Sequence, residues 1–389
     1  MKKALTLLFC LFCIFSLCAC KKVPQANTTI STDITDEQTN EDTKKDPVLT
    51  DKPLYSVSMP IIAEAYLADD GAEIYRHIYQ NMDLILPDPE VADKVFIDFL
   101  NRADTASTSE TILAAAKAAY QGQEYWTPYL CQITFDPMRI DQGILSLFGS
   151  YATFSSSAHP ESSFISANYD LLTGEALTLE DVLTDSATSD FICQEVINSL
   201  NLIRDEKYLF AGFEATVTER FSKELLLETD WYFSENGLCF YFSPYEIASY
   251  ASGIITAEIP YSRLPGILND AYMPAERDIV DGSVIMKKFE QSDMSTIVEL
   301  AELKLNNSDE RILLKTNSEI QQVRIEIGTL SSDGKTFYKM HTVFAASSIT
   351  KDSGIVLEVD LTTYNNDIRI SYLSGTETVY DYISAESIK

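Results

Sequence analysis

The chain has 389 residues, of which 46% are hydrophobic and 11% aromatic, and it carries 59 acidic against 29 basic side chains. The resulting formal charge of −30 argues against a nucleic acid partner, because binding to phosphates requires clustered cations. The hydrophobic content is sufficient for folded cores, and the length allows more than one domain.

Residues 1–19 predict a signal peptide. Lys2 and Lys3 provide a positive start, and an apolar run from residue 4 to residue 15 follows them. This run is too short to cross a bilayer as a helix, which takes roughly 20 apolar residues. Its length fits the hydrophobic region of a secretory signal.

The segment ends in Leu17-Cys18-Ala19-Cys20, which resembles the lipobox of bacterial lipoproteins. The resemblance implies cleavage before Cys20, lipidation of that cysteine, and attachment to the extracytoplasmic face of the cell membrane through the lipid. An ordinary secretory signal and an uncleaved signal anchor are the alternatives. Residues 20–52 are polar and contain no aromatic residue, so they predict a disordered tether.

Residues 53–272 predict an α+β domain, with a mixed, mostly antiparallel sheet and packed helices. Apolar residues at helical spacing predict helices over 91–100, 110–120, 190–202 and 216–227, and a shorter helical element from Thr178. Aromatic and β-branched residues predict strands over 129–135, 144–154, 164–168, 231–234, 238–243 and 254–259. Asp141-Gln142-Gly143 and Glu235-Asn236-Gly237 have the chemistry of hairpin turns.

Several spaced motifs follow one another in this region. They are Ser157-Ala158-His159-Pro160, Asn168-Tyr169-Asp170-Leu171 with Thr173-Gly174, Leu177-Thr178-Leu179-Glu180-Asp181, Trp231-Tyr232, Asn236-Gly237, the run from Phe240 to Ala248, Tyr250-Ala251-Ser252-Gly253, and Glu258-Ile259-Pro260. In this order they resemble the extracytoplasmic domain of RsiV-type anti-sigma factors, which also occurs beside some peptidoglycan deacetylases. The pair Ser157-Ala158 departs mildly from the family, in which Gly-Ala is common. Residues 54–129 would correspond to the family's helical N-terminal part.

The resemblance implies binding outside the cell, since the domain of the RsiV branch binds lysozyme. We expect neither the signalling nor the deacetylation of the relatives, because the sequence shows no anti-sigma segment, transmembrane helix or deacetylase motif. His159, Tyr245, Glu246 and Tyr250 are the candidate ligand-binding residues, as a loop histidine and a polar-aromatic cluster able to stack on a sugar or a protein. A packing role for each of them is the alternative.

The sequence predicts no catalytic residue, metal site or cofactor. It has only three histidines and no zinc-protease, serine-hydrolase or phosphate-loop motif. Ser348-Ile-Thr-Lys351 fits a Ser-x-x-Lys pattern without its partner motifs. Cys131, Cys193 and Cys239 lack zinc-ligand spacing, and we expect them to be buried and reduced, although one disulfide is also compatible with three cysteines.

Residues 281–389 predict a β-sandwich-like domain. Alternating apolar residues predict eight short strands over 283–289, 296–305, 311–315, 323–330, 337–344, 355–361, 368–372 and 379–383.

Two hypotheses about function follow. The first is a membrane-anchored, non-catalytic lipoprotein that binds a cell-envelope protein or glycan, such as a cationic lysozyme-like protein or peptidoglycan. The second is a cell-wall hydrolase or modifying enzyme with an unrecognised acidic site, because 59 carboxylates leave many pairs open. The sequence leaves the oligomeric state open.

Overall fold

The computed structural model describes residues 54–103, 106–155, 160–185, 187–275, 281–306, 308–361, 364 and 366–384. The predicted signal peptide, the predicted tether with Cys20, and His159 lie outside the described residues. Among the described helices, none is both long enough and apolar enough to cross a membrane.

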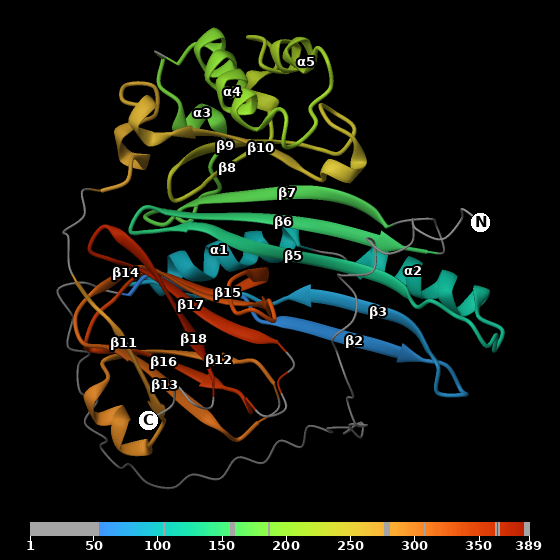
Figure 1. Cartoon of the computed structure of the whole chain (residues 1–389), viewed down its shortest axis with the longest axis vertical. Coiled ribbons are helices and arrows are strands. Elements are labelled where there is room, and N and C mark those ends of the chain that lie inside the picture. The colour runs from blue at the N-terminus through green and yellow to red at the C-terminus, as the bar shows by residue number, and fades with distance from the viewer. Residues whose placement is uncertain are drawn as a thin grey trace, which may run out of the picture.

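The described part of the chain is mostly β-structure, arranged in several largely antiparallel sheets (Figure 1). One sheet has the strand order β2-β3-β5-β6-β7, and only its β3–β5 pair is parallel. Its strands are β2 (Ile61–Leu67), β3 (Glu73–Gln80), β5 (Tyr129–Ile140), β6 (Ile144–Phe154) and β7 (Glu161–Asp170). The hairpin between β5 and β6 turns at Asp141, whose side chain accepts hydrogen bonds from the backbone of Gly143 and Ile144.

Helix α1 (Pro89–Arg102) covers one face of this sheet. Asp88 caps its N-terminus by accepting a hydrogen bond from the backbone of Glu90, and Pro89 suits the first turn. Its apolar stripe is buried, and the ring of Phe99 meets that of Phe135 edge-on at 5.2 Å. Helix α2 (Ala106–Ala119) packs beside it against β3 and β5.

A second layer lies on the other face of the five-stranded sheet. It is the small sheet β10-β9-β8, formed by β8 (Trp231–Phe233), β9 (Gly237–Phe242) and β10 (Ile255–Pro260). The ring of Phe148 in β6 stacks on Tyr232 at 4.8 Å and meets Tyr241 at 4.9 Å, which joins the two layers.

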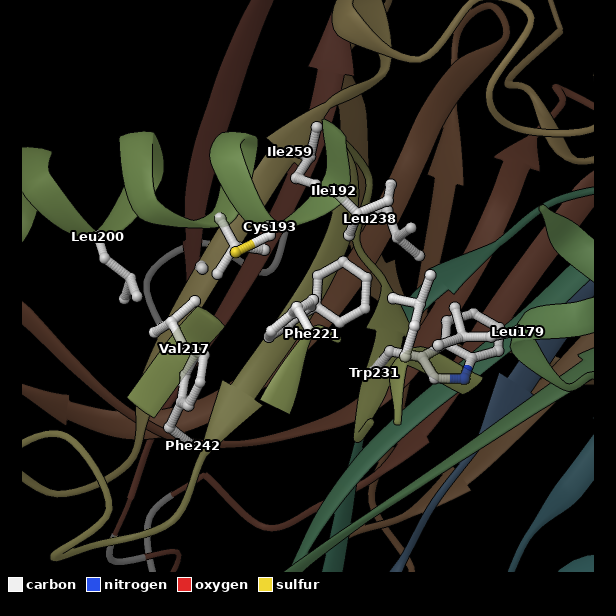
Figure 2. Close-up of a cluster of buried hydrophobic side chains, with 14 of the residues drawn as sticks. Leu179, Ile192, Cys193, Leu200, Val217, Phe221, Trp231, Leu238, Phe242 and Ile259 are labelled. Atoms are coloured by element: carbon white, nitrogen blue, oxygen red, sulfur yellow. The ribbon is translucent and has the colours of Figure 1, made fainter. Parts of the chain in front are cut away.

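Three helices cover the outer face of the small sheet (Figure 1). They are α3 (Leu179–Val182), α4 (Ser189–Ile203) and α5 (Phe213–Arg220). Ile192, Val217 and Leu238 bring helices and sheet together in one apolar cluster (Figure 2). Thr178 caps α3 in a reciprocal capping box with Asp181, and the bond to Thr178 holds the pKa of Asp181 below its usual value.

The C-terminal strands, together with β1 and β4 from the N-terminal part, form two sheets that share one apolar cluster. The strand orders of the two sheets are β18-β17-β14-β15-β1-β4 and β11-β13-β16-β12. The strands are β1 (Ser56–Ser58), β4 (Asp83–Ile85), β11 (Val284–Lys288), β12 (Glu299–Lys304), β13 (Arg311–Thr316), β14 (Ile320–Leu330), β15 (Phe337–Ile349), β16 (Ser353–Glu358), β17 (Asp367–Ser374) and β18 (Glu377–Ile383). Short 3₁₀ helices are η1 (Leu226–Glu228), η2 (Tyr250–Ser252), η3 (Tyr261–Arg263), η4 (Asp270–Tyr272) and η5 (Gln291–Thr296).

The predicted strands of both regions are confirmed, with shifted ends, and so are the helices predicted over 91–100, 110–120 and 190–202 and the short helical element from Thr178. The helix predicted over 216–227 is wrong in its extent, since α5 ends at Arg220 and a short turn of 3₁₀ helix follows. The chain must turn there because Phe221 and Leu226 both enter the core while Leu225 and Leu227 stay exposed. The prediction of a helical N-terminal part is also incomplete, because the four strands β1 to β4 precede helices α1 and α2.

The proposed division into residues 53–272 and 281–389 stays a prediction. Strand β1 lies between β4 and β15, so the N-terminal segment completes a sheet made of C-terminal strands. Val57 is completely buried in this position.

Candidate functional site

The candidate site is built on the segment between β9 and β10. A second segment, between α4 and α5, runs beside it: Phe210 donates its backbone N–H to the carbonyl of Ile247 at 2.9 Å, and Leu209 bridges to Ala248. Four aromatic residues of these two segments, Tyr208, Phe210, Tyr245 and Tyr250, are here named the Tyr245 surface. Tyr208 is 78% exposed and Tyr245 is 65% exposed.

Two of these tyrosines have a backbone conformation that L-residues rarely adopt. The φ angle is +50° at Tyr208 and +72° at Tyr245. A bulky residue in this region costs of order 1–3 kcal/mol, and such strain concentrates at functional sites. Packing of the side chain in the core does not explain either backbone conformation, because both rings are exposed to solvent.

A charged network fixes the base of the Tyr245 surface. Arg220, the last residue of α5, is ion-paired with Glu246 and donates to Asp230 at 2.9 Å. The second carboxylate oxygen of Glu246 accepts the backbone N–H of Ser243 at 3.0 Å. The Arg220 guanidinium also lies over the ring of Phe242, 5.0 Å from its centre. Glu246 therefore holds its loop in place, and its part in ligand binding stays a prediction.

Tyr250 connects the surface to the start of β7. Its ring is 5.7 Å from that of Tyr245, and its hydroxyl donates to the carbonyl of Pro160 at 3.3 Å. The structure therefore brings together three of the four predicted residues, Tyr245, Glu246 and Tyr250. Whether His159 joins them is outside the described residues.

A cavity of about 220 Å³ lies beyond the same network. Its lining includes Arg102 of α1, Ser166 and Asn168 of β7, and Thr229, Asp230 and Trp231. The hydroxyls of Ser166 and Tyr241 lie 3.5 Å apart beside it. Burial raises the pKa of Tyr241 to about 12, so this phenol stays neutral at physiological pH.

The described residues show no cluster of potential metal ligands. No group of three or more His, Cys, Asp or Glu side chains comes close enough to hold a metal ion within the described ranges. His77 lies on β3 and His341 on β15, in two different sheets. Cys131, Cys193 and Cys239 are all buried and none of the three forms a disulfide, so the reduced alternative is the one observed.

Sequence reasoning missed Arg220, Asp230, Tyr208 and Phe210. The one available signal was the sequence Tyr208-Leu209-Phe210, in which two aromatics flank the residue that enters the core. Arg220 and Asp230 carry no such signal, because their partners are set by tertiary contacts.

Residues 180–262 match the family model described as Protein of unknown function (DUF3298). Among solved structures, a member of the DUF3298 family from Bacteroides fragilis NCTC 9343 is 15% identical, with 56% of this chain and 95% of that chain covered and a TM-score of 0.40. A DUF3298 family protein from Pseudomonas aeruginosa PAO1 is 18% identical, with 58% and 99% covered and a TM-score of 0.40. No curated protein matches the chain. The segment that carries Arg220, Tyr245 and Tyr250 is thus similar to the DUF3298 family, whose function is unknown.

Proposed function

We propose that the protein is a lipoprotein anchored by Cys20 to the outer face of the cell membrane, and that its Tyr245 surface binds a cell-envelope protein or glycan without catalysis. The observation that carries the binding role is Tyr245: an exposed ring on a strained backbone, fixed from below by the Glu246–Arg220 ion pair. A rigid exposed tyrosine offers a large contact area at a small cost in conformational entropy.

The charge of the chain favours a cationic ligand. A formal charge of −30 attracts basic proteins and speeds their association at low salt. The resemblance to the RsiV-type domain points in the same direction, which makes a lysozyme-like protein the first ligand to test and peptidoglycan the second. The Cys20 lipid and a polar tether would keep the folded part beside the wall while still attached to the membrane.

The ligand is tested with the mature chain lacking its lipid, residues 21–389. Calorimetric titration with lysozyme at about 0.15 M salt, and co-sedimentation with purified peptidoglycan, should detect binding to at least one of them. Tyr245→Ala should weaken that binding at least about fivefold, as expected for a central tyrosine of an interface. Tyr125→Ala is the matched control, because Tyr125 is 89% exposed and lies elsewhere.

Two results would overturn the binding proposal. One is the absence of binding to both ligands at high micromolar concentration. The other is release of sugars or peptides from purified wall that a single Asp or Glu substitution abolishes, since this would establish the hydrolase alternative.

The anchor is tested separately in cells. Wild-type protein should incorporate labelled palmitate and fractionate with membranes, and Cys20→Ala should do neither. Labelling that persists in Cys20→Ala would contradict the assignment of the lipid to this residue.

We further infer that residues 281–389 act as a sandwich-like support for the α+β part that carries the Tyr245 surface. The shared apolar cluster of the two C-terminal sheets supports this view. Limited proteolysis should cut between residues 273 and 281 before it cuts within either part.

A further inference from the structure

A free strand edge lies next to the Tyr245 surface. Strand β7 is the outermost strand of its sheet and pairs with β6 along its whole length (Figure 1). Only the last part of its outer edge is covered: Asp170 donates to the carbonyl of Glu175 at 2.9 Å, and Asn168 accepts from Leu177 at 2.7 Å.

These two bonds show which residues of β7 face outward. In an antiparallel pair, alternate residues direct both backbone groups to the same side. Since Asn168 and Asp170 face outward, so do Ser162, Phe164 and Ser166. Among the described residues, no backbone hydrogen bond reaches the outward groups of these three. The strand is exposed at residues 161–163 and half-buried at residues 164–166.

Within residues 161–166, the charge of Glu161 is the one feature of the strand that protects this edge. Proteins usually block a free edge with Lys, Pro or a bulge. The sequence from Glu161 to Ser166 contains neither Lys nor Pro, and its register with β6 is continuous. By contrast, the edge strand β11 ends in Lys287-Lys288.

The cavity of about 220 Å³ begins where the covering segment ends, at Ser166 and Leu177. It is smaller than the 300–1,000 Å³ typical of small-molecule sites, and it fits one side chain of a neighbouring strand. The side chain of Ser166 points to the face that carries Tyr241, and the lining there includes charges of both signs: Arg102, and Asp230, which is ion-paired with Arg220. A strand residue opposite Ser166 would point to this same face.

We propose that the outer edge of β7, from Glu161 to Ser166, binds an extended basic peptide segment of a partner protein as an added strand, with one uncharged side chain of that strand entering the cavity. Strand addition supplies backbone hydrogen bonds for affinity and a side-chain pocket for specificity. The basic character follows from Glu161 on the edge and from the charge of −30, which also disfavours a second copy of the chain at this edge. This proposal does not depend on the Tyr245 surface.

The probe is a fluorescein-labelled ten-residue peptide of alternating Lys and Val, titrated with residues 21–389 and followed by fluorescence anisotropy. Ser162→Pro removes one outward N–H and leaves the pairing with β6 intact, as edge prolines do. It should weaken binding about fivefold, the effect of one lost hydrogen bond of about 1 kcal/mol. Ser163→Ala, at the neighbouring inward-facing residue, is the control and should change nothing.

Two further comparisons separate strand addition from simple charge attraction. The same peptide with N-methyl groups on alternate residues keeps its charge but cannot pair, so its binding should be lost. Glu161→Gln, on the edge itself, should weaken binding, whereas Asp205→Asn, an equal charge change at an exposed site elsewhere, should not. Equal binding of the methylated peptide, no binding of the unmodified one, or a wild-type dimer in sedimentation that Ser162→Pro dissociates would each overturn the proposal.

Discussion

Arg324 of β14 is ion-paired with Glu235 in the turn between β8 and β9, at 3.0 Å and across 89 residues of sequence. Both side chains are mostly buried, with 17% and 16% of their surface exposed. Arg324 also donates to the backbone carbonyls of Pro137 and Met138 in β5. One side chain therefore joins the C-terminal sheet to the layers that carry the candidate site.

Arg324→Met should lower the free energy of unfolding by about 2–4 kcal/mol, because it removes the cation that neutralises the mostly buried Glu235 carboxylate, which then keeps only uncharged donors such as the Gln322 amide, and takes one donor from each of two carbonyls. Urea denaturation of residues 21–389 measures the effect. Arg263→Met is the control: its ion pair with Glu195 involves an arginine that is 58% exposed, so the cost should stay within about 1 kcal/mol. Equal losses in the two variants would show that Arg324 has no special role.

Gly237→Ala should destabilise the small sheet by about 1–3 kcal/mol, because a methyl group at this position overpacks the structure. A Cβ there would lie 2.2 Å from the carbonyl oxygen of Ile259, a backbone atom of the paired strand. Gly212→Ala tests backbone strain without a collision. A Cβ at this position would meet open space, and only the φ of +85° opposes the change. Thermal unfolding should show the larger loss for Gly237→Ala.

Acidification should destabilise the protein as the pH falls below about 6.5, the ordinary pKa of histidine. Burial lowers the pKa of His341, the Asp136 carboxylate opposes that shift, and Lys339 adds to it. Burial also lowers the pKa of His77, against the opposing charge of Glu64. Because the unfolded chain binds these protons first, the free energy of unfolding decreases from pH 6.5 downwards.

His341→Asn should flatten this dependence below about pH 6.5, and His77→Asn should flatten what remains. Urea titrations at several pH values give the slope directly. A slope that neither substitution alters would assign the acid sensitivity to carboxylates instead.

The three cysteines of residues 21–389 should resist thiol reagents in the native state. Cys131, Cys193 and Cys239 are buried, and burial raises the pKa of the Cys239 thiol to about 12. The thiolate is the reactive form, so reaction should become rapid only on unfolding. A colorimetric thiol assay should then count three groups in denaturant without reductant; a count of one would reveal a disulfide.

Several elements could be predicted from the sequence because their signals are local. Helix α1 is an example: Asp88-Pro89 begins it, and Val91, Val95 and Phe99 give it one buried face. The hairpin of β8 and β9 was also predicted, but for a different reason than observed. Its central residues are Glu235 and Asn236, neither of which has a positive φ, and Gly237 is needed for the close approach of Ile259.

Long-range pairings had no such signal. Ser56-Val57-Ser58 is too short for its sequence pattern to predict a strand. It nevertheless pairs with β15, some 290 residues later, with Val57 opposite Ala345. Strand β1 pairs with β15 because Val57 is buried beside that strand. The residues next to Val57 in the sequence do not reveal this burial.

The candidate site shows the same division. The sequence by itself determined that Tyr245, Glu246 and Tyr250 lie close together, because only a few residues separate them, and that Leu17-Cys18-Ala19-Cys20 resembles a lipobox. Only the tertiary structure decided that Glu246 pairs with Arg220, that Tyr208 and Phe210 extend the Tyr245 surface, and that β7 keeps a free edge beside it. The physical reason is that these relationships depend on how the sheets and helices pack, whereas helix caps, apolar periods and a cleavage motif depend only on residues that are neighbours along the chain.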